Sequence, residues 1–178
     1  DDFVIGCELE GDARRIMEVI PKRFGRFGLT IHPEKTKLIS FGRPGSSSQS
    51  VDGTGTFDFL GFTHYWVRSR KGYWVIKRKT MKKRLRRAMK SFWVWCKENR
   101  HMAVVDQHSK LCQKLRGYYR YYGVRCNFRS MALVYRHVRI AWRFWLSRRH
   151  RKGVIPWDKF ERVLKEYPLT KPKIYHSI

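Results

Sequence analysis

The first 79 residues alternate between short apolar runs and turn-forming segments, which is typical of β-structure with a covering helix. Residues 2–8 and 37–42 combine β-branched and aromatic side chains, and both segments are predicted to be strands. Residues 12–28 carry apolar side chains at helical spacing and predict a helix, which Pro21 should kink or divide. This order of strand, helix and strand suits a sheet with a helix on one face.

Residues 43–55 are rich in glycine and serine and are predicted to form a loop. The apolar run Phe57–Phe62 follows, and within it Gly61 is expected to mark a bulge or the close approach of another backbone. Residues 63–69 and 73–78 then predict two strands of a hairpin.

From Thr80 onward the apolar residues recur every three or four positions, which is typical of amphipathic helices. The pattern contains three such stripes: Met81, Leu85, Met89, Phe92 and Cys96; Val105, His108, Leu111, Leu115, Tyr118 or Tyr119, and Tyr122; and Met131, Val134, Val138, Ala141, Trp142 and Trp145. The short links between the stripes predict a small helical bundle. A last short helix is expected from Pro156, followed by an extended tail.

The predicted fold class is therefore α+β. Three parts are expected: residues 1–79 with the strands, residues 80–150 with three helices, and residues 151–178 with a short helix and the tail. Because the chain does not begin with methionine, we expect it to be a fragment of a longer protein.

The charge is concentrated in one half of the chain. Residues 1–67 contain 8 basic and 9 acidic side chains, whereas residues 68–178 contain 32 basic and 5 acidic ones, and the whole chain has a formal net charge of +26. Such a one-sided basic block with interleaved aromatic residues is typical of nucleic-acid binding. A membrane-surface role would need a helix with an uninterrupted lipid-facing side, so nucleic acid is the favoured partner and no membrane is expected.

The spacing of the cysteines and the length of the apolar runs indicate where in the cell the protein is located. The four cysteines show no C-x-x-C spacing, and we expect reduced, mostly buried thiols and no zinc site. No apolar run approaches the roughly 18 residues that span a bilayer, and no signal peptide is recognisable. The sequence favours an intracellular protein, cytoplasmic or organellar, that is not secreted.

Two adjacent carboxylates, Asp1 and Asp2, precede the first apolar run in a chain with few acids. Such a pair suits Mg²⁺, which prefers hard oxygen ligands and in two-ion sites stabilises phosphoryl transfer. The alternative is that both residues simply open a strand from a turn.

Four segments, in this order, resemble motifs of group II intron-encoded reverse transcriptases, which also act as maturases. Asp1–Val4 resembles the end of the Tyr-Ala-Asp-Asp motif, Phe27–Lys37 the next palm motif, and Phe59–Phe62 the motif that grips the primer. Leu115–Gly123 resembles the core of the maturase-specific domain X, or thumb. Together the segments cover nearly the whole chain, but the Tyr-Ala of the first motif, the fingers and the upstream palm are missing.

The resemblance implies RNA-directed DNA synthesis by part of a polymerase palm followed by an α-helical thumb. Asp1 and Asp2 would be catalytic and would hold two Mg²⁺ ions, with a third aspartate ligand in the part of the palm that this chain lacks. Lys35 would neutralise or protonate the leaving pyrophosphate, although a surface lysine is an equal alternative. Primer–template contacts would come from Leu60, Gly61 and Phe62. On this view the isolated chain is inactive as a polymerase.

The resemblance also implies that the basic helices bind RNA and assist intron splicing and mobility. The expected contacts are Arg116, Tyr118, Tyr119 and Arg120. The partners would be the intron RNA, an RNA-template/DNA-primer duplex and deoxynucleoside triphosphates. The chain ends without the endonuclease domain that some members of the family carry, which fits either a member without that domain or a C-terminal truncation. A maturase that assists splicing without polymerising, or a generic basic RNA-binding protein, remains the alternative.

Overall fold

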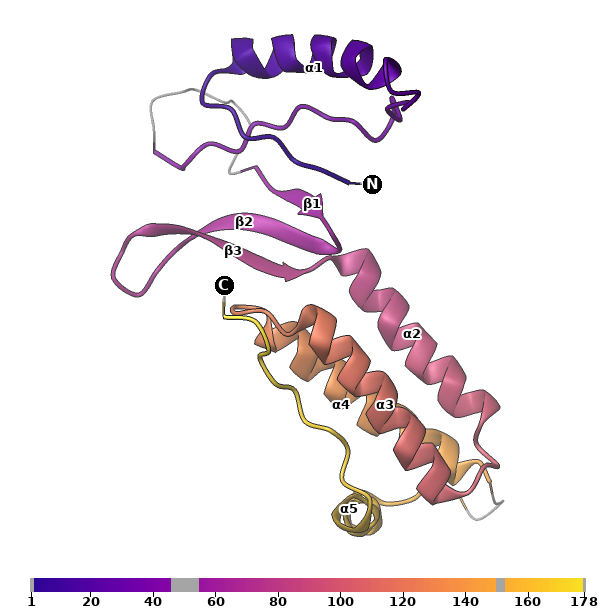
Figure 1. The fold of residues 1–178 in the computed structure, drawn as a ribbon. Helices are drawn as coiled ribbons and strands as arrows, with labels where there is room; N and C mark the ends of the chain where they lie inside the picture. The colour runs from indigo at the N-terminus through magenta and orange to yellow at the C-terminus, as the bar shows by residue number, and fades with distance from the viewer. Residues whose placement is uncertain (1, 46–54, 150–152, 178) are drawn as a thin grey trace. The chain divides into compact units, whose positions relative to one another are not determined.

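The structure is a computed structural model that describes residues 2–45, 55–149 and 153–177 (Figure 1). In these residues the fold is α+β, as predicted, with five helices and one three-stranded antiparallel sheet in the order β1-β2-β3. The elements are α1 (Glu10–Gly25), β1 (Phe57–Phe59), β2 (Phe62–Arg68), β3 (Trp74–Thr80), α2 (Lys82–Glu98), α3 (Val104–Tyr122), α4 (Phe128–Ser147) and α5 (Trp157–Glu166).

The chain divides into two compact units. The first comprises Asp1–Leu60 and His64–Ile76, and the second comprises Gly61–Thr63 and Lys77–Ile178. The second, which we call the helical unit, contains helices α2 to α5.

Helix α1 of the first unit has no buried residue and is favoured by its charges. Glu10 and Asp12 lie in its first turn and Lys22 and Arg23 in its last, where each sign complements the helix dipole. The helix runs through Pro21, so the predicted division does not occur.

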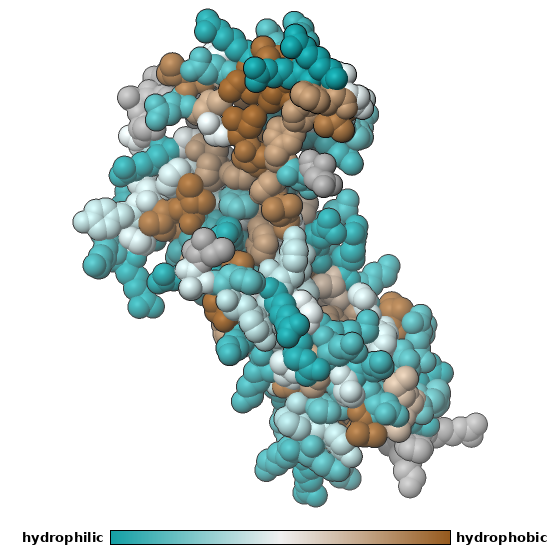
Figure 2. Space-filling view, viewed as in Figure 1, coloured by the Kyte–Doolittle hydropathy of each residue, from teal (hydrophilic) through white to brown (hydrophobic). Residues whose placement is uncertain are grey.

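The predicted strands at residues 2–8 and 37–42 are wrong. Both segments are irregular, and the described residues give neither of them a strand partner. Their large apolar side chains are between 42% and 54% exposed; these are Phe3, Val4, Ile5, Leu38 and Ile39. Figure 2 shows hydrophobic residues gathered next to α1 on the visible face. β-branched residues favour a strand only when a neighbour supplies hydrogen bonds and burial, which explains the difference.

The turn between β1 and β2 differs from the expected bulge. Leu60 and Gly61 both have positive φ angles, 46° and 77°, as the central residues of a type I′ hairpin turn do. A Cβ added to Gly61 would lie 3.1 Å from the Tyr122 hydroxyl oxygen. The glycine is therefore explained by a tight turn and the close approach of a side chain.

The hairpin of β2 and β3 is confirmed. At its tip the Ser69 N–H donates to the Tyr73 carbonyl at 2.7 Å, and Gly72 has a φ of 82°. In the first unit the Trp66 indole N–H donates to the Phe41 carbonyl at 3.2 Å, and the Phe41 and Phe57 rings are 4.8 Å apart. These contacts attach residue 41 to the sheet although it lies in no strand.

The core of the helical unit lies between α2, α3 and α4, which confirms the three predicted helices. Helix α4 packs against both of the others. The fully buried residues include Leu111, Leu115 and Tyr119 of α3 and Met131, Val134, Val138 and Ala141 of α4. Helix α5 adds Phe160, which is also fully buried.

Two buried amides join the segments of this unit. Gln107 donates from Nε2 to the Asn99 carbonyl at 2.5 Å and accepts from the Trp142 indole N–H at 2.7 Å. Asn127 accepts from the Thr80 backbone N–H at 2.8 Å and donates to the Tyr122 carbonyl at 2.8 Å. Asn127 therefore ties the end of β3 to the end of α3 at the start of α4.

The cysteines match the prediction in part. All four are free, and Cys96 and Cys112 are buried, whereas Cys7 and Cys126 are exposed. Burial raises the pKa of Cys96 to about 12, so this thiol stays protonated at neutral pH.

Candidate nucleic-acid interface

Four aromatic rings meet where the β1–β2 turn lies against the end of α3. Phe62 stacks on Tyr121 with ring centroids 6.0 Å apart and an angle of 11° between the planes. Tyr122 contacts Phe62 at 5.4 Å, Tyr121 at 4.8 Å and Tyr118 at 4.6 Å. Tyr118 and Tyr122 are four residues apart on α3, so both project from one side of the helix.

Two arginines of α2 complete this group. Burial raises the pKa of the Tyr122 phenol, and Tyr121 adds to this rise. The positive charges of Arg84 and Arg87 act on the same phenol and partly oppose the rise. We call Phe62, Tyr118, Tyr121, Tyr122, Arg84 and Arg87 the arginine–aromatic cluster. It combines residues from two of the four motifs with the first turns of α2.

The first turns of α2 are unusually basic. The exposed cations are Lys82, Lys83, Arg84, Arg86, Arg87 and Lys90, and the first turn contains no acidic residue. Positive charge at a helix N-terminus opposes the helix dipole, and a charge in this position changes stability by typically 0.3–1 kcal/mol. This arrangement costs stability in the free protein and suits an anionic partner.

Intramolecular ion pairs cannot neutralise this charge. Residues 68–178 contain 5 acidic side chains for 32 basic ones, so most of the cations have no acid to pair with. In Figure 2 hydrophilic residues cover much of the visible surface of the helical unit. A surface of this kind attracts polyanions from solution.

The four predicted RNA contacts on α3 differ in exposure. Arg116 and Arg120 are exposed, and Tyr118 is half-buried. Tyr119 is fully buried and continues the apolar stripe of Leu111 and Leu115 at a spacing of four residues. Tyr119 therefore packs in the core of this structure and is not placed to contact RNA.

Sequence reasoning missed four members of the cluster: Tyr121, Tyr122, Arg84 and Arg87. Tyr121 is 53% exposed and is the aromatic residue of this segment that reaches the surface. The exposure follows from the helical repeat, because Tyr121 lies two positions after the buried Tyr119. Arg84 and Arg87 were not distinguishable from the other cations of α2 by any sequence signal.

The structure brings together parts of the predicted primer contact and the thumb motif. Phe62 contacts Tyr121 and Tyr122, and the carbonyl of Gly61 accepts a hydrogen bond from the Met81 N–H at 3.0 Å, directly before α2. Leu60 is 52% exposed.

The predicted catalytic residues belong to the first unit. Asp1 lies outside the described residues, Asp2 is exposed on an irregular segment, and Lys35 is exposed in a turn that its N–H closes to the His32 carbonyl at 3.2 Å. Among the described residues no group of three acidic, histidine or cysteine side chains could hold a metal ion. Asp2 thus offers one hard oxygen donor of the kind Mg²⁺ prefers, short of a complete site.

Comparison with known proteins gives no further assignment. No protein-family model matches the chain. No curated protein and no solved structure matches it either. The resemblance to group II intron reverse transcriptases therefore stays a prediction from the four motifs. Within the described residues no helix is long and apolar enough to cross a membrane.

Proposed function

We propose that the helical unit binds RNA and that the chain is part of an RNA-directed DNA polymerase of the group II intron type. The observation that supports RNA binding most directly is the arginine–aromatic cluster. It combines the positive charges of Arg84 and Arg87, which act on Tyr122, with the exposed ring of Tyr121, which contacts Tyr122. The assignment to a polymerase rests on the four motifs and their order.

The cluster suits binding to an RNA strand with unpaired bases or to the end of an RNA duplex. Guanidinium groups form paired hydrogen bonds with phosphate oxygens, so Arg84 and Arg87 would hold the backbone. An exposed aromatic ring such as that of Tyr121 stacks on an unpaired or terminal base. Such contacts position the RNA and depend little on its sequence.

The intron RNA and the template–primer duplex would share this surface. Both present A-form geometry, in which phosphates and 2′-hydroxyl groups are the accessible features. Arg116 and Arg120, exposed on α3, would extend the contact along the backbone. Gly61 would act indirectly, because its missing side chain leaves room for the Tyr122 hydroxyl and so lets the tyrosines of α3 lie against the β1–β2 turn.

The polymerase activity is proposed for a protein in which the palm is complete. Asp1 and Asp2 would then hold Mg²⁺, which when bound supplies the positive charge that phosphoryl transfer requires. Lys35 would interact with the pyrophosphate of the deoxynucleoside triphosphate. Asp2, which is exposed, would supply one of these carboxylate ligands.

A primer-extension assay separates the polymerase from a splicing-only maturase or a generic RNA-binding protein. In a reverse transcriptase that carries this chain, Asp2→Asn is expected to lower primer extension strongly, because it removes a carboxylate charge that Mg²⁺ needs. RNA affinity measured by filter binding should not change, since Asp2 lies outside the helical unit. The matched control is Glu34→Gln, which also neutralises one exposed acid of the first unit. Primer extension that survives Asp2→Asn would contradict the assignment to a polymerase.

A further inference from the structure

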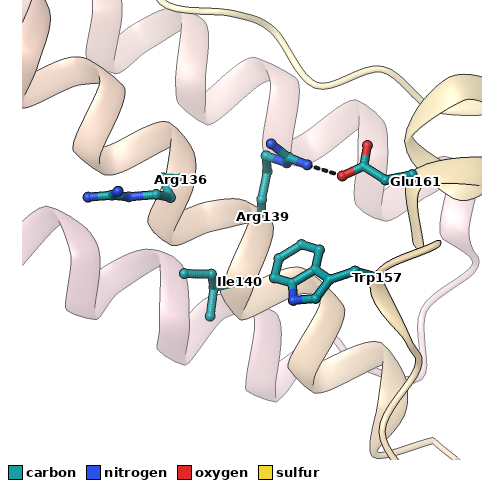
Figure 3. Close-up of a pocket in the computed structure, with 5 residues that line it drawn as sticks. All are labelled: Arg136, Arg139, Ile140, Trp157 and Glu161. Atoms are coloured by element: carbon teal, nitrogen blue, oxygen red, sulfur yellow. Dashed lines mark hydrogen bonds and ion pairs between the residues drawn. The ribbon is translucent and has the colours of Figure 1, made fainter. Parts of the chain in front are cut away.

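An open pocket of about 340 Å³ lies between α4 and α5, and the contacts described so far do not involve it. Its lining residues are Arg136, Arg139, Ile140, Trp157 and Glu161 (Figure 3). Figure 3 shows Ile140 of α4 and Trp157 of α5 side by side, with the ion pair between Arg139 and Glu161 next to them. The volume is at the lower end of the range typical of small-ligand sites, roughly 300–1,000 Å³.

The aromatic wall of this pocket is held in place although it is exposed. Trp157 is 43% exposed, and the guanidinium carbon of Arg143 lies 4.1 Å from the centre of its ring. Arg143 is itself fixed, because its Nη1 donates to the Ile155 carbonyl at 2.8 Å. On the side of the core the Trp157 ring contacts Phe160, with centroids 5.9 Å apart. The indole is thus oriented before any ligand arrives.

The apolar part of the pocket remains partly exposed to water. Ile140 is 40% exposed beside the indole, which is an unfavourable arrangement in water for two large apolar side chains. A flat apolar group placed against Trp157 and Ile140 would remove this surface from water. Base–aromatic stacking is an interaction of this kind.

The charged residues of the pocket select an anionic ligand. Arg136 and Arg139 line the pocket, and Arg143 of the same helix lies against the Trp157 ring. The one acid of the lining, Glu161, pairs with Arg139. Arg136 is exposed at the rim, where its guanidinium is available to a phosphate group. A planar base that carries a phosphate combines both requirements.

We propose that this pocket binds one unpaired nucleotide of an RNA strand, with the base against Trp157 and Ile140 and the adjoining phosphate on Arg136. The proposal rests on RNA binding by the helical unit and adds a second contact of a different kind. Paired bases are stacked inside a duplex and cannot enter, so the pocket distinguishes a bulged or looped-out nucleotide from continuous duplex. The rival occupant is an acidic peptide with an aromatic residue.

The test compares two RNA hairpins that differ by one bulged 2-aminopurine nucleotide. The 178-residue chain is titrated into each hairpin, and binding is followed by fluorescence anisotropy of an end label. We expect binding of the bulged hairpin to be about tenfold tighter, as base stacking on an aromatic ring allows, and accompanied by a change in 2-aminopurine fluorescence. Trp157→Ala should abolish the preference without changing affinity for the continuous hairpin, and Trp157→Phe should retain most of it.

Arg136→Ala tests the phosphate contact, with Arg129→Ala as the matched control on the same helix. Both variants remove one exposed charge of α4, but only Arg136 lines the pocket. Arg136→Ala should reduce the preference for the bulge, whereas Arg129→Ala should leave it intact. Circular dichroism checks folding. If Trp157→Ala does not fold, a cross-linking experiment on the unmodified chain takes its place. Under ultraviolet light, a bulged 4-thiouridine should then cross-link to the peptide that contains Trp157.

The outcomes separate the two proposals. Three results would overturn the pocket assignment: equal affinity for both hairpins, a preference that survives Trp157→Ala, or a 4-thiouridine that does not cross-link. RNA binding by the helical unit would still hold in each case. Failure to bind either hairpin would overturn both. An acidic aromatic peptide that binds the chain and loses affinity in Trp157→Ala, while the RNA preference is absent, would assign the pocket to a protein partner instead.

Discussion

Replacing Asn127 with leucine is expected to lower the free energy of unfolding of the helical unit by about 3–5 kcal/mol. The side chain is 1% exposed and hydrogen-bonds to Thr80 at the end of β3 and to Tyr122 at the end of α3. Leucine has a similar size but leaves the Thr80 backbone N–H and the Tyr122 carbonyl without their partner. A buried polar group left unsatisfied costs about 1–3 kcal/mol, and the Thr80 hydroxyl loses its contact to the same amide as well.

Urea denaturation followed by circular dichroism of the helices measures this effect. Asn127→Asp should be intermediate, since an aspartate retains the acceptor for the Thr80 N–H but cannot donate to the Tyr122 carbonyl when it is ionised. The control is Arg125→Ala, an exposed neighbour whose replacement should stay within about 0.5 kcal/mol of the unmodified chain. A loss below about 1 kcal/mol for Asn127→Leu would mean that this amide does not join the segments as described.

The double variant Arg84→Ala/Arg87→Ala is expected to weaken RNA binding by about 10–100-fold near 0.1 M salt. Each phosphate contact releases counterions, and the loss of two should flatten the slope of log affinity against log salt by about two. The charges of both arginines act on Tyr122, so the expected loss comes from this cluster rather than from net charge in general. Arg116→Ala/Arg120→Ala should act in the same direction.

The matched control removes two charges at the other end of the same helices. Lys97 lies in the last turn of α2, and Lys110 lies in the first half of α3; both are exposed. Lys97→Ala/Lys110→Ala lowers the net charge by the same amount and should weaken binding distinctly less. Equal losses in the two double variants would show that the RNA contact is not centred on the arginine–aromatic cluster.

The helices could be predicted from sequence because their signal is local. Leu111 and Leu115 of α3 and Val134 and Val138 of α4 show the four-residue spacing that a buried helix face requires, and all are fully buried. The hairpin tip was likewise predictable from its glycine, Gly72, which has a positive φ. In each case neighbouring residues contain the information.

Local sequence could not show whether residues 2–8 and 37–42 form strands. Whether Phe3–Ile5 forms a strand depends on a partner that the sequence of the segment does not specify. The same limit applies to the site. The basic start of α2 is evident from sequence, but which of its arginines act on Tyr122 depends on how α2 and α3 pack. The burial of Tyr119 depends on which face of α3 is turned toward the core.

The salt dependence of RNA binding by the unmodified 178-residue chain tests the central claim most directly. Binding to a structured RNA is measured at salt concentrations between about 50 and 200 mM. If the basic helical unit neutralises roughly 6–10 phosphates, the affinity should fall steeply and log-linearly, by about 10³–10⁵ over this range for duplex DNA and by a similar or smaller factor for RNA. Affinity that does not change with salt, or no measurable binding at 50 mM, would contradict the account.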